Sequence, residues 1–304
     1  MSEKPNETID CVRVRASGSN AEVLRELLAA TCSQNASEWA DPDGAPVVFT
    51  FYCTESTAAT QLRDAIAARI ASWQQQELLH GDPIPVTTDK LQREDWANSW
   101  KRYFHTFKAS RRLVIKPSWE DYAAAPGELV LEIDPGMSFG TGYHPTTRAC
   151  LQLLDQLAET FREQPLLDAG CGSGILSMAA WKLGFRQIYA FDHDPQATLM
   201  ARENLVRTGA AEAVAVTAAD IEDYEPPRRC PLVIANILAH VLDRNAERLA
   251  AYLDSEREDH ALVLSGIMTS QYAGVRKRFE SLGLGEVERL TFDDWTTGCY
   301  RRTG

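Results

Sequence analysis

In the first 90 residues, some segments alternate apolar and polar residues as strands do, and others repeat apolar residues at the spacing of a helix. Apolar and polar residues alternate over Ile9–Ala16, and Val47–Cys53 is rich in β-branched and aromatic residues, so both are predicted strands. Helical spacing marks Asn20–Cys32, with Asn20 as its cap, and Ser56–Trp73, before a short last strand. This order predicts a small α+β domain of the ferredoxin-like kind over residues 1–90.

From Leu166 onward, strand-like and helix-like segments alternate. The expected strands lie in PLLDAG, QIYAFD, AVAVTAAD, CPLVIAN, HALVLSG and EVERLTF, and helices are expected between most of them. Such alternation predicts an α/β, Rossmann-like domain with a mostly parallel sheet and helices on both faces. Ligands of these sheets bind at the carboxyl ends of the strands, where two glycine-containing loops of this chain fall.

The segment between these two regions, residues 91–124, is rich in aromatic and basic residues. Asp95 is predicted to cap a short helix, and RRLVIKPSW is expected to contain a strand. We predict that this segment connects the N-terminal domain to a second domain at 125–304. Its aromatic residues are more often used for packing between domains than for ligand contact.

The formal net charge of −12 is unevenly distributed along the chain. Residues 1–90 hold 7 basic and 13 acidic residues, residues 91–124 hold 7 and 4, and residues 125–304 hold 17 and 26. The acidic N-terminal region disfavours direct nucleic-acid binding and favours a basic protein partner, although acidity for solubility alone explains it as well.

Seven scattered cysteines without a C-x-x-C pair predict a reduced protein without a structural metal. The polar first ten residues contain no apolar run typical of a signal peptide, and no long apolar stretch predicts a membrane span. We therefore expect a cytoplasmic protein, acting as a monomer.

The loop DAGCGSG follows the first strand of the second domain. Its spacing, from Gly170 through Gly172 to Gly174, is G-x-G-x-G, whereas a dinucleotide fingerprint is G-x-G-x-x-G. Asp168 would repel a pyrophosphate but favour a ligand with a positively charged end. S-adenosylmethionine carries an ammonium and a sulfonium, so the loop favours this cofactor, whose methionine part would lie against bare glycine backbone.

Acidic residues also end the next strand. Asp192 is expected to accept both hydroxyls of an adenosine ribose, with a solvated strand end as the alternative. For Asp194, before Pro195, we favour a helix cap over a ligand contact.

Asn236 ends the buried strand VIAN. An amide at this position would accept a hydrogen bond from an incoming amine and orient its lone pair, whereas the alternative is a turn-forming asparagine.

An earlier loop, DPGMSFGTGYHPTT, precedes a predicted helix that would return the chain to the first strand. We expect residues 139–147 to form a mobile lid, because three glycines give its backbone freedom and it lacks apolar periodicity. Gly142→Pro should then slow turnover with a smaller effect on folding. His144 is favoured as a structural residue over a catalytic base, since Pro145 fixes the turn.

These segments together resemble the ribosomal protein L-eleven (L11) methyltransferases. The resemblance is carried by DPGMSFGTGYHPTT, LLDAGCGSGIL, FDHDPQA, ANILA and SGIM, and upstream by EDWANSWKRYF and RLVIKPSWE. It covers residues 94–304, and Tyr143 departs from the smaller residue expected at its position.

The resemblance implies a class I methyltransferase domain with a seven-stranded sheet and an N-terminal domain that recognises the ribosomal protein. The family's S-adenosylmethionine contacts carry over to Thr147, Gly170, Asp192 and Asn236. Residues Phe139, Gly140 and Thr141 would close over the cofactor beside the acceptor.

The reaction that follows is transfer of a methyl group to an amine, either an α-amine or a lysine side chain. The amine must be neutral, and deprotonation at pH 7 costs about 4–5 kcal/mol for lysine but only about 1 kcal/mol for an α-amine. Because no strong base is evident, positioning and desolvation are expected to dominate. The alternatives are methylation of another protein, an RNA or a small molecule, and a non-catalytic binding module.

Overall fold

A computed structural model shows two compact units, Met1–Tyr103 and Phe104–Gly304, which are considered separately. It describes residues 8–16, 20–31, 37–39, 47–53, 56–76, 78–81, 83–92, 104–134, 142–254, 256–257 and 259–302. The short helix predicted near Asp95 lies outside these residues.

The described part of the first unit contains an antiparallel sheet covered by two helices. Its elements are β1 (Thr8–Ala16), α1 (Asn20–Thr31), β2 (Ser37–Trp39), β3 (Val47–Cys53), α2 (Ser56–Gln75) and β4 (Val86–Gln92). The strand order is β2-β3-β1-β4, and β1 pairs antiparallel with both β3 and β4. This order is that of a ferredoxin-like sandwich.

Alternation along the two central strands builds the core of this unit. Val12 and Val14 of β1 and Phe49 and Phe51 of β3 are buried together with apolar residues of both helices. Asn20 begins α1, and its side-chain amide pairs with the backbone of His80 through two hydrogen bonds of 2.6 and 3.0 Å. The Asn20 side chain therefore ties the start of α1 to the segment before β4.

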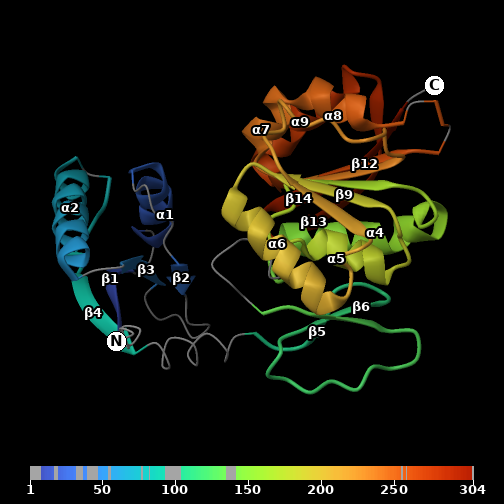
Figure 1. The fold of residues 1–304 in the computed structure, drawn as a ribbon. Helices are drawn as coiled ribbons and strands as arrows, with labels where there is room; N and C mark the ends of the chain where they lie inside the picture. Colours follow the sequence, from blue (N-terminus) through green and yellow to red (C-terminus); the bar gives the residue numbers. More distant parts are fainter. Residues whose placement is uncertain are drawn as a thin grey trace. The chain divides into compact units, whose positions relative to one another are not determined.

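Within the described part of the second unit, seven strands form one sheet (Figure 1). They are β8 (Leu166–Ala169), β9 (Ile188–Asp192), β10 (Val214–Ala218), β11 (Leu232–Asn236), β12 (Ala261–Met268), β13 (Leu284–Phe292) and β14 (Trp295–Arg302). The order is β10-β9-β8-β11-β12-β14-β13, and only β14 runs antiparallel to its neighbours. The mostly parallel sheet is thus confirmed, while β14 had not been predicted.

Helices cover both faces of this sheet (Figure 1). One layer holds α4 (Pro145–Phe161), α5 (Ile175–Lys182) and α6 (Pro195–Thr208), and the other holds α7 (Ala239–Arg244), α8 (Ala246–Tyr252) and α9 (Thr269–Glu280). Alternate residues of β11 enter different cores: Leu232 and Ile234 pack with the first layer, and Val233 and Ala235 with the second. Because both faces are covered there, the central strand β11 is apolar from Leu232 to Ala235.

A smaller sheet of β5 (Phe107–Lys108), β6 (Leu113–Lys116) and β7 (Leu129–Glu132) packs outside the first helical layer. The interdomain segment predicted at 91–124 is therefore divided, because its residues from 104 onward belong to the second unit.

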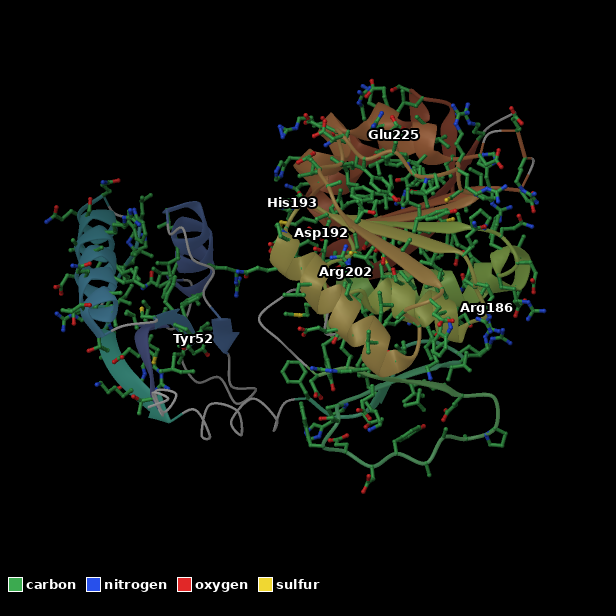
Figure 2. The ribbon with its side chains drawn as sticks, in the orientation of Figure 1. Tyr52, Arg186, Asp192, His193, Arg202 and Glu225 are labelled. Atoms are coloured by element: carbon green, nitrogen blue, oxygen red, sulfur yellow. The ribbon has the colours of Figure 1, made fainter. Side chains whose placement is uncertain are left out.

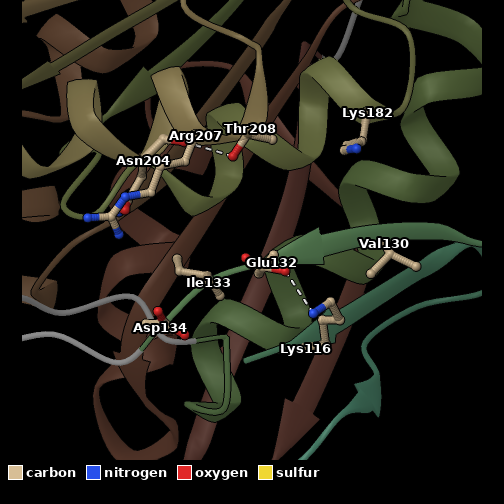
Figure 3. Close-up of a pocket in the computed structure, with 9 residues that line it drawn as sticks. All are labelled: Lys116, Val130, Glu132, Ile133, Asp134, Lys182, Asn204, Arg207 and Thr208. Atoms are coloured by element: carbon tan, nitrogen blue, oxygen red, sulfur yellow. Dashed lines mark hydrogen bonds and ion pairs between the residues drawn. The ribbon is translucent and has the colours of Figure 1, made fainter. Parts of the chain in front are cut away.

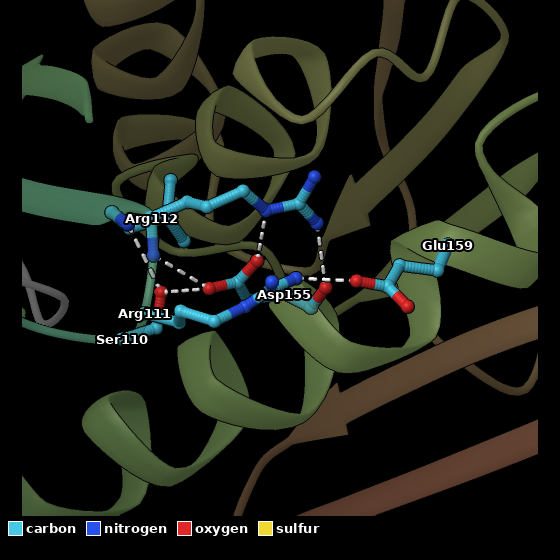
Figure 4. Close-up of polar contacts among 6 residues, drawn as sticks. Ser110, Arg111, Arg112, Asp155 and Glu159 are labelled. Carbon is cyan, nitrogen blue, oxygen red and sulfur yellow. Dashed lines mark hydrogen bonds and ion pairs between the residues drawn. The ribbon is translucent and has the colours of Figure 1, made fainter. Parts of the chain in front are cut away.

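This small sheet is fixed to α4 by one buried carboxylate (Figure 4). Asp155 accepts hydrogen bonds from the Ser110 hydroxyl at 2.6 Å, the Arg112 backbone N–H at 2.8 Å and Arg112 Nε at 2.5 Å. Arg112 also donates to the Asp155 backbone carbonyl at 2.8 Å. Burial would raise the pKa of Asp155, but these bonds outweigh it and hold the pKa below its ordinary value.

The ends of α6 follow the sequence signals. The Asp194 side chain accepts a hydrogen bond of 2.8 Å from the Gln196 backbone N–H, Pro195 is the first helical residue, and Gly209 ends the helix with φ +79°. The preferred reading of Asp194 as a helix cap is confirmed. None of the described helices is both long enough and apolar enough to cross a membrane.

Candidate functional site

Three neighbouring strands bring three predicted site residues to one edge of the sheet. Ala169 of β8 pairs with Phe191 of β9 on one side and with Ala235 of β11 on the other. The next residues, Gly170, Asp192 and Asn236, therefore follow at the same level. The strand order reverses between β8 and β11, and such a switch point is where ligands bind in open α/β sheets.

The glycines of the loop after β8 are required by its backbone. Gly170 has φ +76°, and a Cβ there would lie 2.4 Å from Cγ2 of Ile237. Gly174 has φ +79° at the start of α5, where a Cβ would lie 3.2 Å from that of Ala201. Any side chain at these positions would strain the backbone and displace the packing.

Asp192 holds this loop in place. It is only 8 % exposed, and its Oδ2 accepts a hydrogen bond of 2.9 Å from the Gly172 backbone N–H. Its Oδ1 accepts another of 3.0 Å from Asp194 N–H and lies 3.2 Å from His193 Nδ1 (Figure 2). Asp192 is therefore an oriented carboxylate rather than a solvated strand end, and each oxygen keeps lone-pair capacity.

Asp168 is fully buried, and only one of its two carboxylate oxygens accepts hydrogen bonds from the described residues. Its Oδ2 accepts bonds from the Ser177 hydroxyl at 2.7 Å and the Ser177 backbone N–H at 3.1 Å, whereas its Oδ1 has no partner among the described residues. Burial raises the pKa of Asp168 to about 6, although the Ser177 bonds lower it, and the charge of Asp192 adds to the rise.

Asn236 is oriented by the first turn of α4. Its Nδ2 donates to Thr147 Oγ1 at 3.4 Å, while its Oδ1 is buried without a partner among the described residues. The amide thus presents an acceptor, and a turn-forming role does not explain that acceptor.

A buried hydroxyl pair holds the same helical turn. Ser265 of β12 donates to the backbone carbonyl of Thr146 at 3.2 Å and lies 2.6 Å from Thr297 Oγ1 of β14. Ser265 uses its one proton toward Thr146, so Thr297 donates to Ser265. The start of α4 is therefore linked by side-chain hydrogen bonds to β11 and β12, and through Ser265 to β14.

The lid predicted over residues 139–147 is wrong for its last part. Pro145, Thr146 and Thr147 form the first turn of α4, and both threonines are 1 % exposed. Proline after His144 is a helix-start signal that outweighs the lack of apolar periodicity. Phe139, Gly140 and Thr141 lie outside the described residues.

Gly142 cannot serve as the proposed proline position. Its φ of +83° is inaccessible to proline, and a Cβ there would lie 3.1 Å from Ile175 Cδ1. Gly142→Pro would distort a packed backbone, so a marked loss of stability is expected in place of the smaller effect on folding that the sequence predicted.

The residues after Gly142 are packed. Tyr143 lies against Phe104 and Phe107, with ring centroids 4.9 and 4.5 Å away. His144 caps α4: its Nδ1 lies 2.7 Å from the Thr146 hydroxyl, and burial lowers the pKa of the imidazole. These contacts support the structural role favoured for His144.

A cavity of about 270 Å³ lies elsewhere in this unit, between β6, β7 and the last turns of α5 and α6 (Figure 3). Its charges are mixed, and Lys116 and Glu132 are already paired at 2.7 Å. No predicted site residue lines it, so it is separate from the strand-end site. The described residues contain no cluster of three or more potential metal ligands.

Sequence reasoning missed Ser177, Ser265 and Thr297. Ser177 follows the glycine loop by one helical turn, a spacing that could have suggested its bond to Asp168. The bond from Ser265 joins residues 119 positions apart, so no local signal predicts it.

The strand order, the glycine loop after β8 and the acidic end of β9 together define a class I methyltransferase domain. The family model for ribosomal protein L11 methyltransferase (PrmA) matches residues 13–303. The chain therefore belongs to the ribosomal protein L11 methyltransferase family, which confirms the resemblance seen in the sequence.

Individual relatives agree with this assignment. A ribosomal protein L11 methyltransferase of Geobacter metallireducens is 41% identical over 248 residues, covering 81% of this chain and 79% of that protein. One from Pelotomaculum thermopropionicum is 38% identical over 284 residues, covering 92% and 87%. The crystal structure of a ribosomal protein L11 methylase from Lactobacillus delbrueckii subsp. bulgaricus matches with a TM-score of 0.58 and 27% identity, covering 66% of this chain and all of that one.

The site fits S-adenosylmethionine, the cofactor of this class. Asp168 Oδ1 and Asn236 Oδ1 are buried acceptors without partners among the described residues, and each needs a donor to be stable. The cofactor's ammonium and the acceptor's amine are donors of the required kind.

Proposed function

We propose that this protein methylates amines of ribosomal protein L11 with S-adenosylmethionine. The observation that carries the proposal is the buried Oδ1 of Asn236, which has no partner in the part of the chain that the structure describes; Thr147 orients this amide at the strand end beside the glycine loop. This oxygen is an acceptor with a fixed direction, as an incoming amine requires.

The cofactor contacts divide among three strand ends. We propose that Asp168 Oδ1 accepts from the ammonium, that Asp192 accepts the ribose hydroxyls, and that the backbone at Gly170 and Gly172 adjoins the methionine part. The cofactor supplies a methyl group activated by the sulfonium. Asp192 is prepared for its part because the N–H groups of Gly172 and Asp194 already fix both carboxylate oxygens.

The acceptor must reach the site as a neutral amine. At pH 7 a lysine loses its proton at a cost of about 4–5 kcal/mol, and an apolar cleft lowers this cost. Asn236 accepts one remaining N–H and directs the lone pair toward the methyl group. We assign His144 a structural role, since its Nδ1 is engaged with Thr146 at the start of α4, and we propose that the proton leaves to water.

The first unit is proposed to recognise the protein substrate. Its acidic excess over residues 1–90 suits a basic ribosomal protein. A truncated protein that begins near residue 93, as the sequence suggested, or at Phe104, should bind S-adenosylmethionine with unchanged affinity but methylate L11 poorly. Methylation by the truncated protein at the full kcat/KM would place recognition in the second unit.

Labelled S-adenosylmethionine and ribosomal proteins from cells that lack this methylation provide the direct test. We expect label in L11, on lysine or α-amino nitrogen by mass spectrometry. Label in RNA, in another protein or in no macromolecule would show that the proposal is wrong.

A further inference from the structure

Two large apolar side chains are exposed where β11 and β12 lead into the helices that follow them. Leu238, which precedes α7, is 58 % exposed, and Met268, which ends β12 and precedes α9, is 43 % exposed. Leu238 follows Asn236 by only two residues.

Folding does not account for these side chains. Both residues occupy N-cap positions with extended backbones, at φ −60° and −63°. Serine, threonine, aspartate and asparagine are favoured there because their side chains accept a backbone N–H, which leucine and methionine cannot do well. Their exposure also forgoes the stabilisation that burial would give.

The backbone brings both positions to the same side of the site. Asn236, the last residue of β11, pairs with Ser265, and β12 continues for three more residues to Met268. Gly266 lies against the first of these turns: a Cβ on Gly266 would be 2.3 Å from the carbonyl oxygen of Ile237. The following helices, α7 and α9, also pack together.

We infer that Leu238 and Met268 form an apolar platform for the aliphatic stem of the acceptor lysine in the protein substrate. The inference rests on the proposed function. A lysine has four methylene groups before its amine, and contact with an apolar surface next to Asn236 would bury them while the nitrogen meets Oδ1. The same surface disfavours the ammonium form. The flexible thioether of Met268 adapts to different neighbouring side chains of the substrate.

Single and double full-length variants with Leu238→Ser and Met268→Ser test the platform, with purified unmethylated L11 as substrate. Val206→Ser is the matched control, because Val206 is 68 % exposed in the last turn of α6, which runs back toward the opposite edge of the sheet. We expect kcat/KM for L11 to fall about tenfold in each single variant, mainly through KM, as loss of apolar contact predicts. The affinity for S-adenosylmethionine should match wild type, the Tm should not fall because serine is favoured at both N-cap positions, and Leu238→Met should retain activity.

Unchanged kcat/KM for L11 in both single variants, with an active wild type, would overturn the platform alone. The same conclusion follows if cofactor affinity falls in step with kcat/KM, because the residues would then act on the cofactor site. If the wild type itself does not methylate L11, the proposed function is wrong, and so is the platform that rests on it.

Discussion

Two buried aspartates of the second unit differ in how completely their oxygens are used. Asp155 is 2 % exposed, and both of its oxygens accept hydrogen bonds from Ser110 or Arg112 (Figure 4). Asp168 is fully buried, and among the described residues only its Oδ2 has a partner, Ser177. The pKa of Asp155 is held below its ordinary value, whereas that of Asp168 is raised to about 6.

We interpret Asp155 as a structural carboxylate and propose that Asp168 is a carboxylate that binds the cofactor. A buried charge whose partners are complete stabilises contacts between elements, here between the small sheet and α4. A buried charge that lacks a partner lowers the stability of the fold, and such a cost is typical of functional sites. Burial alone therefore does not distinguish the two acidic residues.

The largest expected effect is a loss of stability when the carboxylate of Asp155, whose two oxygens both accept hydrogen bonds, is removed. Asp155→Ala leaves the partly buried Arg112 without its partner and should lower the free energy of unfolding by about 3 kcal/mol. Urea unfolding measures the change, and Glu159→Ala, which removes an exposed pair with Arg111, is the control, with at most about 0.5 kcal/mol expected. Equal effects of the two substitutions would contradict the role of Asp155.

The same carboxylate makes stability depend on pH. Because the pKa of Asp155 is lowered in the folded protein, the stability it contributes is present above the unfolded pKa and is lost as pH falls through the folded pKa.

Removal of the Asp168 carboxylate should weaken cofactor binding more than it changes stability. Asp168→Asn is expected to weaken S-adenosylmethionine binding by about 2–3 kcal/mol, since a hydrogen bond between charged groups is lost. Stability without cofactor should not fall at pH 7. The raised folded pKa means that the stability contributed by Asp168 is present below the unfolded pKa and is lost as pH rises through about 6. Calorimetry and urea unfolding of the same protein check both parts, and a large loss of stability with intact binding would make Asp168 a second structural residue.

Asp192 is an intermediate case, because backbone N–H groups already use part of each oxygen. Asp192→Ala should weaken S-adenosylmethionine binding by about 1.5–2 kcal/mol, within the range of hydrogen bonds to charged groups. Titration calorimetry with circular dichroism as the fold control measures it. Equal affinity in a folded variant would remove Asp192 from the site.

The smallest expected effect concerns the hydroxyl pair that positions α4. Thr297→Val removes the donor to Ser265 and should cost about 1 kcal/mol of stability. Its kcat should also fall, because Thr147 and Asn236 lose alignment, while Thr297→Ser restores kcat. A stability loss without any change in kcat, or failure of serine to restore it, would make the pair structural only.

Much of the second unit could be predicted because its signals are local. The buried strands β8, β9 and β11 and the glycine loop between β8 and α5 are contiguous patterns, and strand alternation then places Gly170, Asp192 and Asn236 at one edge. The strand β14 was missed because polar residues and Gly298 interrupt its pattern, and its pairing with β12 and β13 is tertiary.

The details of the site depend on contacts that no spacing reveals. The sequence indicated that Asp168 favours a positive charge, but its bond to Ser177 and its unpartnered Oδ1 follow from the packing of α5 on the sheet. The start of α4 was misread as a lid because glycines suggested freedom, whereas Tyr143, His144 and Thr146 are fixed by aromatic contacts and hydrogen bonds.

The dependence of S-adenosylmethionine affinity on pH tests the role of Asp168 most directly. With a pKa of about 6, Asp168 is mostly protonated at pH 5 and mostly ionised at pH 7.5, and only the ionised form attracts the ammonium. Titration calorimetry should show affinity rising about tenfold across this range, with proton release near pH 6, and Asp168→Asn should bind weakly with little pH dependence. Affinity in the wild type that is independent of pH, or a rise that Asp168→Asn retains in full, would contradict this account.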